Sequence, residues 1–370
     1  MKKVETVTFH LANNYGAVLQ AYALQKVISQ KYNTEILNYD NKFISNNYKA
    51  FKQASKNPIK TIYHFVKDIC NYNKEIKRIR LFDNFRNNYL KMSNHFTNDE
   101  NPQYPTADVY IVGSDQVWNP FLTNGVDNVY LLDKLENTKK ISYAASSGNI
   151  KYIDENKEEF FTKFNAFDYV SVREEKLKNY LIKNGRKNVD VVLDPTLLLT
   201  KEMWEEFAGK ERIEKDKYVF VYSVNNANKL FIKFVNKFAK EKGLKIVFFD
   251  KNDIKNCYKY NKKSYYSTGP VEFVNLLFYA DYVITTSFHG TALSCILNKN
   301  FFVVLSTFPD RLDTLLEILN LKDRIIYNMC DYEKALSNVI DWRRVNNLLK
   351  IARDKSLAWL NNSIECDKNE

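Results

Sequence analysis

The segment at residues 280–305 contains His289, one of four histidines in a chain of 370 residues, directly followed by Gly290. The apolar run DYVITT precedes SFHG, and TALSCIL follows with helical spacing, which predicts a strand, a loop and a helix. Ligands of open α/β sheets lie beyond the carboxyl ends of strands, where helix N-termini attract anions. His289 could donate a proton to a reacting group there; a loop histidine with a structural hydrogen bond is the alternative.

Arg173 is a second candidate, because it follows the apolar run YVSV and precedes the helical run EEKLKNYLIKN. Its planar guanidinium can hold a carboxylate or a phosphate through two parallel hydrogen bonds. The alternative is an arginine at a helix start that pairs with Glu174 or Glu175. The residue types alone favour neither interpretation.

Polar residues near the ends of other predicted strands are candidates for binding a sugar. In GSDQVWNP, Asp115 and Gln116 could bind hydroxyl groups and Trp118 could stack on a sugar ring; a capped turn with the tryptophan in the core is the alternative. The segment NNYG could line the site or cap the next helix, and the aspartate of LDPT could be a site acid or part of a rigid turn. The candidates are Asn14, Gly16, Ser114, Asp115, Gln116, Trp118 and Asp194.

Alternating strand and helix patterns must position these residues. Short apolar runs such as ADVYIVG and DYVITT alternate with runs of helical period, as expected for parallel sheets covered by helices. The alternation breaks near the middle of the chain, so we predict two Rossmann-like α/β domains with parallel sheets and a binding site in the cleft between them. The predicted limits are 1–205, with a basic helical insertion at about 41–101, then 206–340, and a C-terminal helix and tail at 341–370.

Composition and motifs argue against several classes of protein. The chain has no P-loop and no GxGxxG, the usual motifs for binding nucleoside triphosphates and dinucleotides. Its five cysteines are scattered without CxxC spacing, which argues against a disulfide framework and a zinc site. The formal net charge of +11 attracts phosphates, nucleic acids and anionic lipids alike. No nucleic-acid reader motif accompanies this charge, so we expect no specific nucleic-acid partner.

The segments that could contact or cross a membrane are the N-terminus, long apolar runs and the basic insertion. The N-terminus lacks the apolar core of a signal peptide, and no window approaches the roughly 18 uninterrupted apolar residues of a membrane span. We therefore expect a cytoplasmic protein. The aromatic and basic residues of the insertion at 41–101 form either a solvated face or, as a hypothesis, a peripheral contact with the inner face of the membrane.

Seven segments together resemble one known family, the polysaccharide pyruvyl transferases, in the bacterial and archaeal branch with the SFHG motif. They occur in the same order from about residue 5 to residue 330 and are NNYGAVLQAYAL, GSDQVWNP, ISYAASSG, VSVREE, VVLDPTLLL, GPVEFVNLLFYADYVITTSFHGTALSCILNK and DRLDTLLEILNL. The resemblance implies a fold similar to GT-B glycosyltransferases and transfer of a pyruvyl group from phosphoenolpyruvate to a sugar of a cell-surface glycan or its precursor. It also implies that His289 and Arg173 are the catalytic residues.

The implied reaction needs a proton donor for the methylene carbon of the enolpyruvyl group and a holder for its anionic groups. We predict His289 as the acid and Arg173 as the holder, with phosphoenolpyruvate as donor substrate and neither a cofactor nor a metal. The predicted substrate-binding set is completed by Ser287, Gly290, Thr291 and Arg311. Many members of the family carry an arginine where this chain has Ser287, so the charge contact made there is either lost in this chain or supplied elsewhere, by Arg311 or Lys299.

Two other functions stay open on the sequence alone. A GT-B glycosyltransferase that uses a sugar nucleotide shares the expected fold and charge. A non-catalytic glycan-binding or nucleotide-binding module would keep its ligand after loss of His289. For the pyruvyl transferase, the expected acceptor is a nucleotide-linked, lipid-linked or polymeric sugar.

Overall fold

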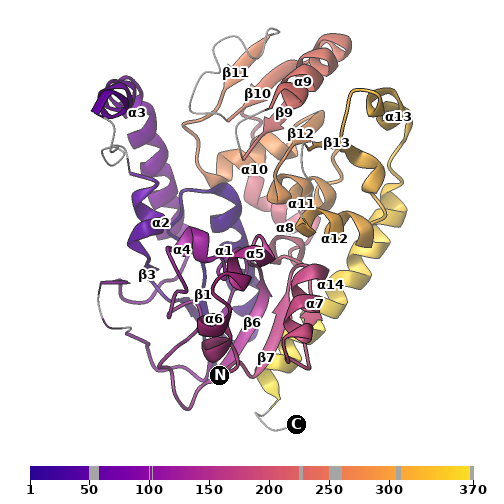
Figure 1. The fold of residues 1–370 in the computed structure, drawn as a ribbon. Helices are drawn as coiled ribbons and strands as arrows, with labels where there is room; N and C mark the ends of the chain where they lie inside the picture. The colour runs from indigo at the N-terminus through magenta and orange to yellow at the C-terminus, as the bar shows by residue number, and fades with distance from the viewer. Residues whose placement is uncertain are drawn as a thin grey trace. The chain divides into compact units, whose positions relative to one another are not determined.

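The chain is divided into two compact units, seen in the computed structural model in Figure 1. The model describes residues 1–49, 58–99, 101, 103–224, 228–249, 261–305 and 310–366. Unit 1 comprises Met1–Tyr72, Phe82–Leu198 and Ala352–Glu370, and unit 2 comprises Asn73–Leu81 and Leu199–Ile351. Each unit contains one six-stranded parallel sheet with helices between its strands, which confirms the predicted fold class. The domain limits of the sequence analysis, near residues 205 and 341, stay predictions.

The sheet of unit 1 has the strand order β2-β1-β5-β6-β7-β8, with every neighbouring pair parallel. Its strands are β1 (Lys3–Val7), β2 (Asn33–Ile36), β5 (Val109–Val112), β6 (Lys139–Ala145), β7 (Tyr169–Val172) and β8 (Asp190–Val191). A separate parallel pair joins β3 (Tyr39–Asp40) to β4 (Phe96–Thr97). The strand order reverses between β1 and β5, so the carboxyl ends of these two strands form the switch point where ligands of such sheets bind.

Most helices of unit 1 connect one strand of its sheet to the next. They are α1 (Tyr15–Ile28), α2 (Lys42–Asn46), α3 (Pro58–Tyr89), α4 (Pro120–Thr123), α5 (Ile150–Asp154), α6 (Lys157–Phe164), α7 (Glu175–Lys183), the short η1 (Pro195–Leu197) and the later part of α14 (Trp342–Glu365). Both α2 and α3 lie in the segment predicted as a helical insertion, of which residues 50–57 and 100 fall outside the described residues. Residues 73–81 of α3 are grouped with unit 2, where Arg78 Nη1 donates to the Tyr266 carbonyl oxygen at 3.0 Å.

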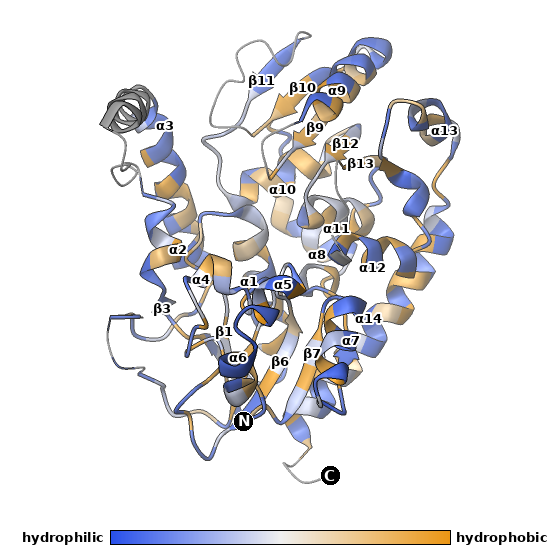
Figure 2. Ribbon diagram, in the orientation of Figure 1, coloured by the Kyte–Doolittle hydropathy of each residue, from blue (hydrophilic) through white to orange (hydrophobic). Residues whose placement is uncertain are grey.

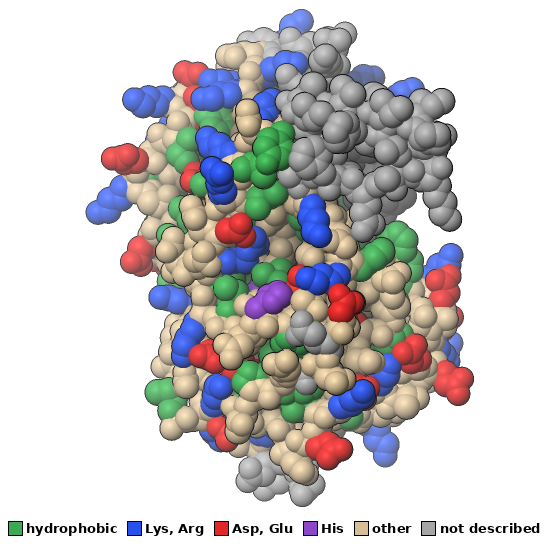
Figure 3. All heavy atoms as spheres, turned by 90° about the vertical axis from the view of Figure 1, so that its left-hand side faces the viewer, with side chains coloured by type: hydrophobic (Ala, Val, Ile, Leu, Met, Phe, Trp, Pro, Cys, Tyr) green, Lys and Arg blue, Asp and Glu red, His purple; other side chains and the backbone are tan. Residues whose placement is uncertain are grey.

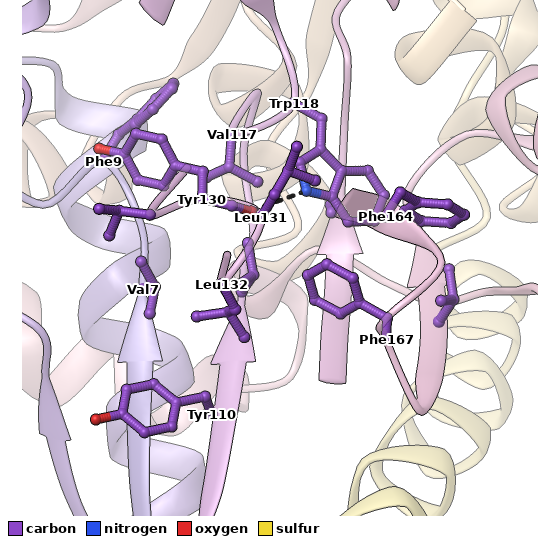
Figure 4. Close-up of a cluster of buried hydrophobic side chains, with 14 of the residues drawn as sticks. Val7, Phe9, Tyr110, Val117, Trp118, Tyr130, Leu131, Leu132, Phe164 and Phe167 are labelled. Atoms are coloured by element: carbon purple, nitrogen blue, oxygen red, sulfur yellow. Dashed lines mark hydrogen bonds between the residues drawn. The ribbon is translucent and has the colours of Figure 1, made fainter. Parts of the chain in front are cut away.

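The core of unit 1 is formed by alternate residues of its strands and by aromatic side chains of the connecting segments (Figure 4). Val7 of β1 and Tyr110 of β5 point to the same face of the sheet and belong to one cluster with Phe164 and Phe167. The strands of both units are largely hydrophobic in Figure 2, as expected when helices cover a parallel sheet. Burial of each such side chain stabilises the fold by about 1.5–3 kcal/mol.

Glu5 is a charged residue inside this core. Its side chain lies fully buried in the middle of β1, and its Oε1 is 3.2 Å from Lys3 Nζ. Burial raises the pKa of Glu5 from 4.5 to about 7, against the opposing effect of Lys3. Between these two values the folded chain holds a proton that the unfolded chain has released, so the contribution of Glu5 to stability falls as the pH rises through that window.

We expect Glu5→Gln to raise the free energy of unfolding by about 1–3 kcal/mol at about pH 8, because glutamine carries no charge to bury. At about pH 4, where both folded and unfolded chains hold the proton, the two proteins should be equally stable. Urea denaturation at the two pH values measures this difference. Equal stabilisation at both would show that the effect is packing rather than ionisation.

The sheet of unit 2 has the strand order β11-β10-β9-β12-β13-β14 and is also fully parallel. Its strands are β9 (Tyr218–Tyr222), β10 (Lys245–Phe248), β11 (Lys262–Ser264), β12 (Tyr282–Thr285), β13 (Phe301–Val304) and β14 (Ile325–Ile326). Its helices are α8 (Lys201–Ala208), α9 (Lys229–Lys242), α10 (Pro270–Phe278), α11 (Phe288–Ile296), α12 (Asp310–Ile318), the short η2 (Lys322–Arg324), α13 (Asp331–Ser337) and the beginning of α14. The strand order reverses between β9 and β12, which places the switch point of unit 2 at their carboxyl ends.

The charged side chains of the face shown in Figure 3 are mixed. Lys and Arg are interspersed with Asp and Glu among the residues coloured by type. Within the described ranges, no helix combines the length and the apolar character needed to cross a membrane.

Candidate functional site

His289 lies at the switch point of unit 2. Strand β12 ends at Thr285, Ser287 is the N-cap of α11, and His289 occupies the first turn of that helix. The helix begins at Phe288, earlier than the sequence predicted, so the histidine belongs to the helix and not to the loop before it. Its side chain is 8% exposed, and its ring packs edge-on against Phe288 with 5.2 Å between centroids. The backbone N–H groups that open α11 favour an anion beside it.

The residues around His289 hold the start of α11 on the end of β12. A Cβ atom at position 290 would lie 2.6 Å from Thr285 Oγ1, so only glycine allows this approach without a shift. The close packing at Gly290 is thus made with Thr285, and the predicted contact of Gly290 with substrate stays a prediction. Ser287 Oγ accepts from Gly290 N at 3.3 Å, and buried Thr291 donates its hydroxyl to the Ser287 carbonyl at 2.9 Å. Thr291 therefore supports the helix, and the structure shows no surface on it for the predicted substrate contact.

The two cations expected to replace the missing arginine lie at opposite edges of the sheet. Arg311 is in the first turn of α12, which follows β13, the parallel neighbour of β12, so it belongs to the same edge as His289. Lys299 precedes β13, and its Nζ donates to the Ala280 carbonyl at 3.2 Å, before β12 begins. Since β12 spans about 13 Å at 3.3 Å per residue, the amine lies at the amino edge. The prediction for Lys299 is wrong, and Arg311 stays a candidate.

Arg173 is buried in a cluster of acids at the carboxyl edge of unit 1. The residue is 3% exposed, and its Nη1 donates to Asp194 Oδ2 at 2.8 Å. Its Nε lies 3.4 Å from Glu174 Oε1, and its Nη2 lies 3.6 Å from Asp115 Oδ1. Burial alone would lower the pKa of Arg173, but Glu174, Asp194 and Asp115 together raise it above its usual value.

These contacts correspond to the ion-pairing alternative for Arg173, with Asp194 and Asp115 as partners in addition to Glu174. Three carboxylates surround one guanidinium, so the cluster carries a formal charge of −2 and does not attract a further anion. The guanidinium is thus paired within the fold, and the holding of a ligand carboxylate or phosphate by Arg173 stays a prediction. Arg173 fixes the positions of the acids around it.

Asp194 forms a rigid turn, the second of the two interpretations left open for it. It is 1% exposed, and its Oδ1 accepts from both the backbone N and the hydroxyl of Thr196, at 3.0 and 2.7 Å. Its Oδ2 accepts from Arg173, and Ser114 Oγ lies 3.2 Å from the same oxygen. Both carboxylate oxygens are bonded within the fold, so the prediction that Asp194 binds substrate is not supported by its surroundings.

The segment after β5 brings Ser114 and Asp115 to the switch point of unit 1. Gly113 has φ of 119°, and a Cβ there would lie 2.2 Å from the Tyr143 carbonyl oxygen, so the chain passes β6 too closely for any other residue. Ser114 is fully buried and donates its hydroxyl to the Ala144 carbonyl at 2.8 Å. Asp115 is 9% exposed, the most exposed of the three acids that face Arg173. Gln116 is partly exposed and accepts from Asn119 Nδ2 at 3.1 Å.

Trp118 belongs to the core of unit 1, which corrects its prediction as a sugar-stacking residue. The side chain is 2% exposed and donates its Nε1–H to the Tyr130 carbonyl at 3.1 Å (Figure 4). Phe160, Phe164 and Phe167 surround the indole edge-on, at centroid distances of 5.3–5.8 Å. No face of the ring is available to a sugar.

Asn14 caps the first helix, as one of its two interpretations predicted. Its Oδ1 accepts from Gly16 N at 2.9 Å at the start of α1. Gln20, one turn further along this helix and fully buried, accepts from Ser114 N at 3.1 Å and donates to Thr8 Oγ1 at 2.7 Å. This buried amide joins the two loops of the switch point, and its signal in the sequence is a polar residue on the apolar face of α1.

His10 and Arg86 are further polar residues beside β1 that the sequence analysis did not select. His10 is fully buried, with Nδ1 3.1 Å from the Thr8 carbonyl and Nε2 3.2 Å from Asn38 Oδ1, and burial lowers its pKa. Arg86 of α3 is 6% exposed and donates to Asn13 Oδ1 at 2.9 Å. Both residues contact the loop after β1, so they help to fix the conformation of this loop at the switch point.

Comparison with known proteins identifies the sequence family. A family model described as polysaccharide pyruvyl transferase matches residues 14–307, which is more than half of the chain. The matched range includes His289, Arg173, the loop after β5 in unit 1 and both loops of the switch point of unit 2. No curated protein matches the sequence.

Solved structures with a similar fold are sugar-nucleotide epimerases. The UDP-GlcNAc 2-epimerase from Methanocaldococcus jannaschii has a TM-score of 0.54 and 12% identity, with 96% of this chain and 99% of that chain covered. The corresponding epimerase from Rickettsia bellii has a TM-score of 0.53 and 12% identity, with 99% and 97% covered. A protein described as a putative UDP-GlcNAc 2-epimerase from Listeria monocytogenes has a TM-score of 0.53 and 12% identity, with 100% and 98% covered. At this identity the likeness shows a GT-B-like fold alone.

Proposed function

Because the chain belongs to the polysaccharide pyruvyl transferase family, we propose that it transfers a pyruvyl group from phosphoenolpyruvate to a sugar of a cell-surface glycan or its precursor. The product is a ketal, which bridges two hydroxyl groups of one sugar. The observation that carries this proposal is the position of His289, in the first turn of α11 at the switch point of unit 2. A proton donor and an anion-attracting helix start meet there, and the reaction needs both.

In the proposed mechanism His289 protonates the methylene carbon of phosphoenolpyruvate. The carbon that bears the phosphate gains positive character, and a sugar hydroxyl attacks it. Phosphate then leaves with the electrons of its C–O bond, and a second hydroxyl closes the ring and releases its proton. The N–H groups at the start of α11, with Arg311 at the same edge, hold the anionic groups of the donor. Proton donation of this kind contributes about 10²–10⁴-fold to the rate.

The acid cluster of unit 1 suits the acceptor better than the donor. Its negative charge repels phosphoenolpyruvate, whereas a carboxylate can accept the proton of an attacking hydroxyl. Asp115 is the most exposed of the acids around Arg173, so we assign this role to it and assign Arg173 to holding it in place. The location of the reaction between the two domains stays a prediction, as do the cytoplasmic location and the peripheral membrane contact.

Incubation of the protein with each donor class tests the proposal against a GT-B glycosyltransferase, whose fold is compatible with the structural neighbours. With phosphoenolpyruvate and a mixture of surface-glycan fragments as acceptor, we expect release of inorganic phosphate and an acid-labile gain of one pyruvyl group by mass spectrometry. With UDP-sugars we expect no nucleoside diphosphate. Release of nucleoside diphosphate instead would identify a glycosyltransferase, and sugar binding without either product would identify a binding module.

A further inference from the structure

An exposed aromatic pair lies at the carboxyl edge of the sheet of unit 1. Phe121 of α4 stacks on Tyr152 of α5, with 5.3 Å between the ring centroids and 16° between the ring planes. The two helices follow the carboxyl ends of the neighbouring strands β5 and β6 and contact each other (Figure 1). Phe121 is 67% exposed although Tyr152 covers one face of its ring, so the other face is open to a ligand.

Hydrogen bonds tie this aromatic pair to the loop that carries Asp115. Asn119 caps α4, because its Oδ1 accepts from Phe121 N at 3.1 Å, and its Nδ2 donates to Gln116 Oε1 at 3.1 Å. The Asp115 carbonyl accepts from Ser146 N at 2.9 Å, which joins the loop after β5 to the loop that leads into α5. The exposed ring is therefore held in a fixed position relative to the switch point of unit 1.

Two polar side chains of the loop after β5 are accessible at the same edge. The Nε2 of Gln116 is accessible and donates to no described residue, and the Asp115 side chain keeps 12% of its surface exposed. An amide N–H donates to a hydroxyl group, and a carboxylate accepts from one. Phe121 lies six positions after Asp115, which limits their separation to about 20 Å even in an extended chain, so one short glycan can contact both.

The surroundings of the exposed ring favour a sugar over an apolar chain. Apart from Phe121, the exposed residues of α4, α5 and their caps are polar: Asn124, Asn149, Lys151, Asp154 and Glu155. A pyranose has C–H groups on a flat face and hydroxyl groups around its edge, so it matches a single open aromatic face within a polar rim. A lipid chain or an apolar peptide would need a larger continuous apolar surface.

We propose that the open face of Phe121 stacks on a sugar ring of the acceptor glycan, and that Gln116 donates to hydroxyl groups of the same glycan. The choice of a sugar rests on the ring and its polar rim, whereas its assignment to the acceptor rests on the proposed function. Phe121 thus has the role that the sequence analysis expected of Trp118, three positions earlier in the chain. It determines how tightly the acceptor binds, and it takes no part in proton transfer.

Saturation-transfer NMR of the full chain with lactose, cellobiose, chitobiose and mannobiose tests this contact without a donor. We expect at least one disaccharide to bind, with the strongest saturation on the C–H protons of one ring face. Phe121→Ala and Phe121→Leu should each weaken binding by about three- to tenfold, since leucine is apolar but not flat. Phe121→Tyr keeps the ring and should bind as the wild type does. Tyr327→Ala removes an aromatic side chain of unit 2 that is 44% exposed, and it should have no effect.

Steady-state kinetics distinguish this inference from the proposed function. With phosphoenolpyruvate and the glycan fragments, Phe121→Ala should raise the apparent KM for the acceptor by about three- to tenfold and leave the KM for phosphoenolpyruvate unchanged. If no phosphate is released, the proposed reaction is wrong, whereas a disaccharide whose binding requires Phe121 still supports the stacking contact. The inference is overturned if no disaccharide binds at about 10 mM, if Phe121→Leu binds as well as the wild type, or if phosphate is released and Phe121→Ala leaves the acceptor KM unchanged.

Discussion

His289→Gln should lower kcat for phosphate release from phosphoenolpyruvate by about 10²–10⁴-fold. Glutamine is similar in size and can hydrogen-bond, but it cannot give a proton to a carbon atom. Because the ring lies in the first turn of α11, at the surface end of the helix, and glutamine suits a helix, the variant should fold with nearly unchanged stability. A coupled phosphate assay and thermal unfolding measure the two quantities.

His95→Gln is the matched control for this experiment. His95 is on unit 1, its side chain is 50% exposed, and its Nε2 lies 3.8 Å from Asp40 Oδ2. Its replacement should change neither kcat nor the unfolding temperature measurably, because the side chain is half exposed and lies outside the predicted site. Near-normal turnover of the His289→Gln variant would refute the assignment of the acid.

Arg173→Ala should reduce the free energy of unfolding by about 3–5 kcal/mol, because it leaves Asp194 and its neighbouring acids buried without their cation. Arg173→Lys keeps the charge but not the planar arrangement of donors, so it should cost less. If Arg173 positions Asp115, the loss of activity in the lysine variant appears in kcat, and the KM for phosphoenolpyruvate stays constant. Urea denaturation and steady-state kinetics of both variants give these values.

Asp194→Asn provides the control for the arginine variants. It removes the same ion pair from the other side and keeps the shape of the turn that begins η1. If the network acts through structure, this variant should show the same pattern as Arg173→Lys: reduced stability, reduced kcat and constant KM for the donor. A large rise in KM confined to the arginine variants would instead show that the guanidinium touches phosphoenolpyruvate.

Many strands and helices can be predicted from the sequence, because the segments with a strand or helix pattern also bury their apolar residues in the folded protein. Runs such as YVFVYSV and DYVITT are short, apolar and bounded by polar residues, and they form β9 and β12. The break in the predicted alternation, at about 195–217, contains α8. This helix is short, and only its buried residues, Trp204, Phe207 and Ala208, mark its inner face. Helices of four or five residues, such as α4 and α5, have too few turns to show a period.

The sequence predicts the surroundings of some candidate site residues but not of others. The position of His289 follows from a strand, a cap and a helix that are consecutive in sequence. The position of Trp118 depends on Phe160, Phe164 and Phe167, which reach it only through the fold. Two ionic partners of Arg173, Asp115 and Asp194, likewise come from other loops. The sequence itself argues against Lys299 as a ligand contact, since a residue that precedes a parallel strand lies at the amino end of that strand.

Ser287 determines how the start of α11 attracts negative charge. Serine bonds Gly290 N and leaves the attraction to backbone dipoles, which are fixed in direction. An arginine at the same position would add a full cation on a flexible stem and remove a cap that stabilises the helix by about 1 kcal/mol. The electric field at this helix start is therefore weaker than one that includes an arginine, but its direction is fixed. We expect such a field to discriminate between donors by the direction in which their anionic group points more than by its total charge.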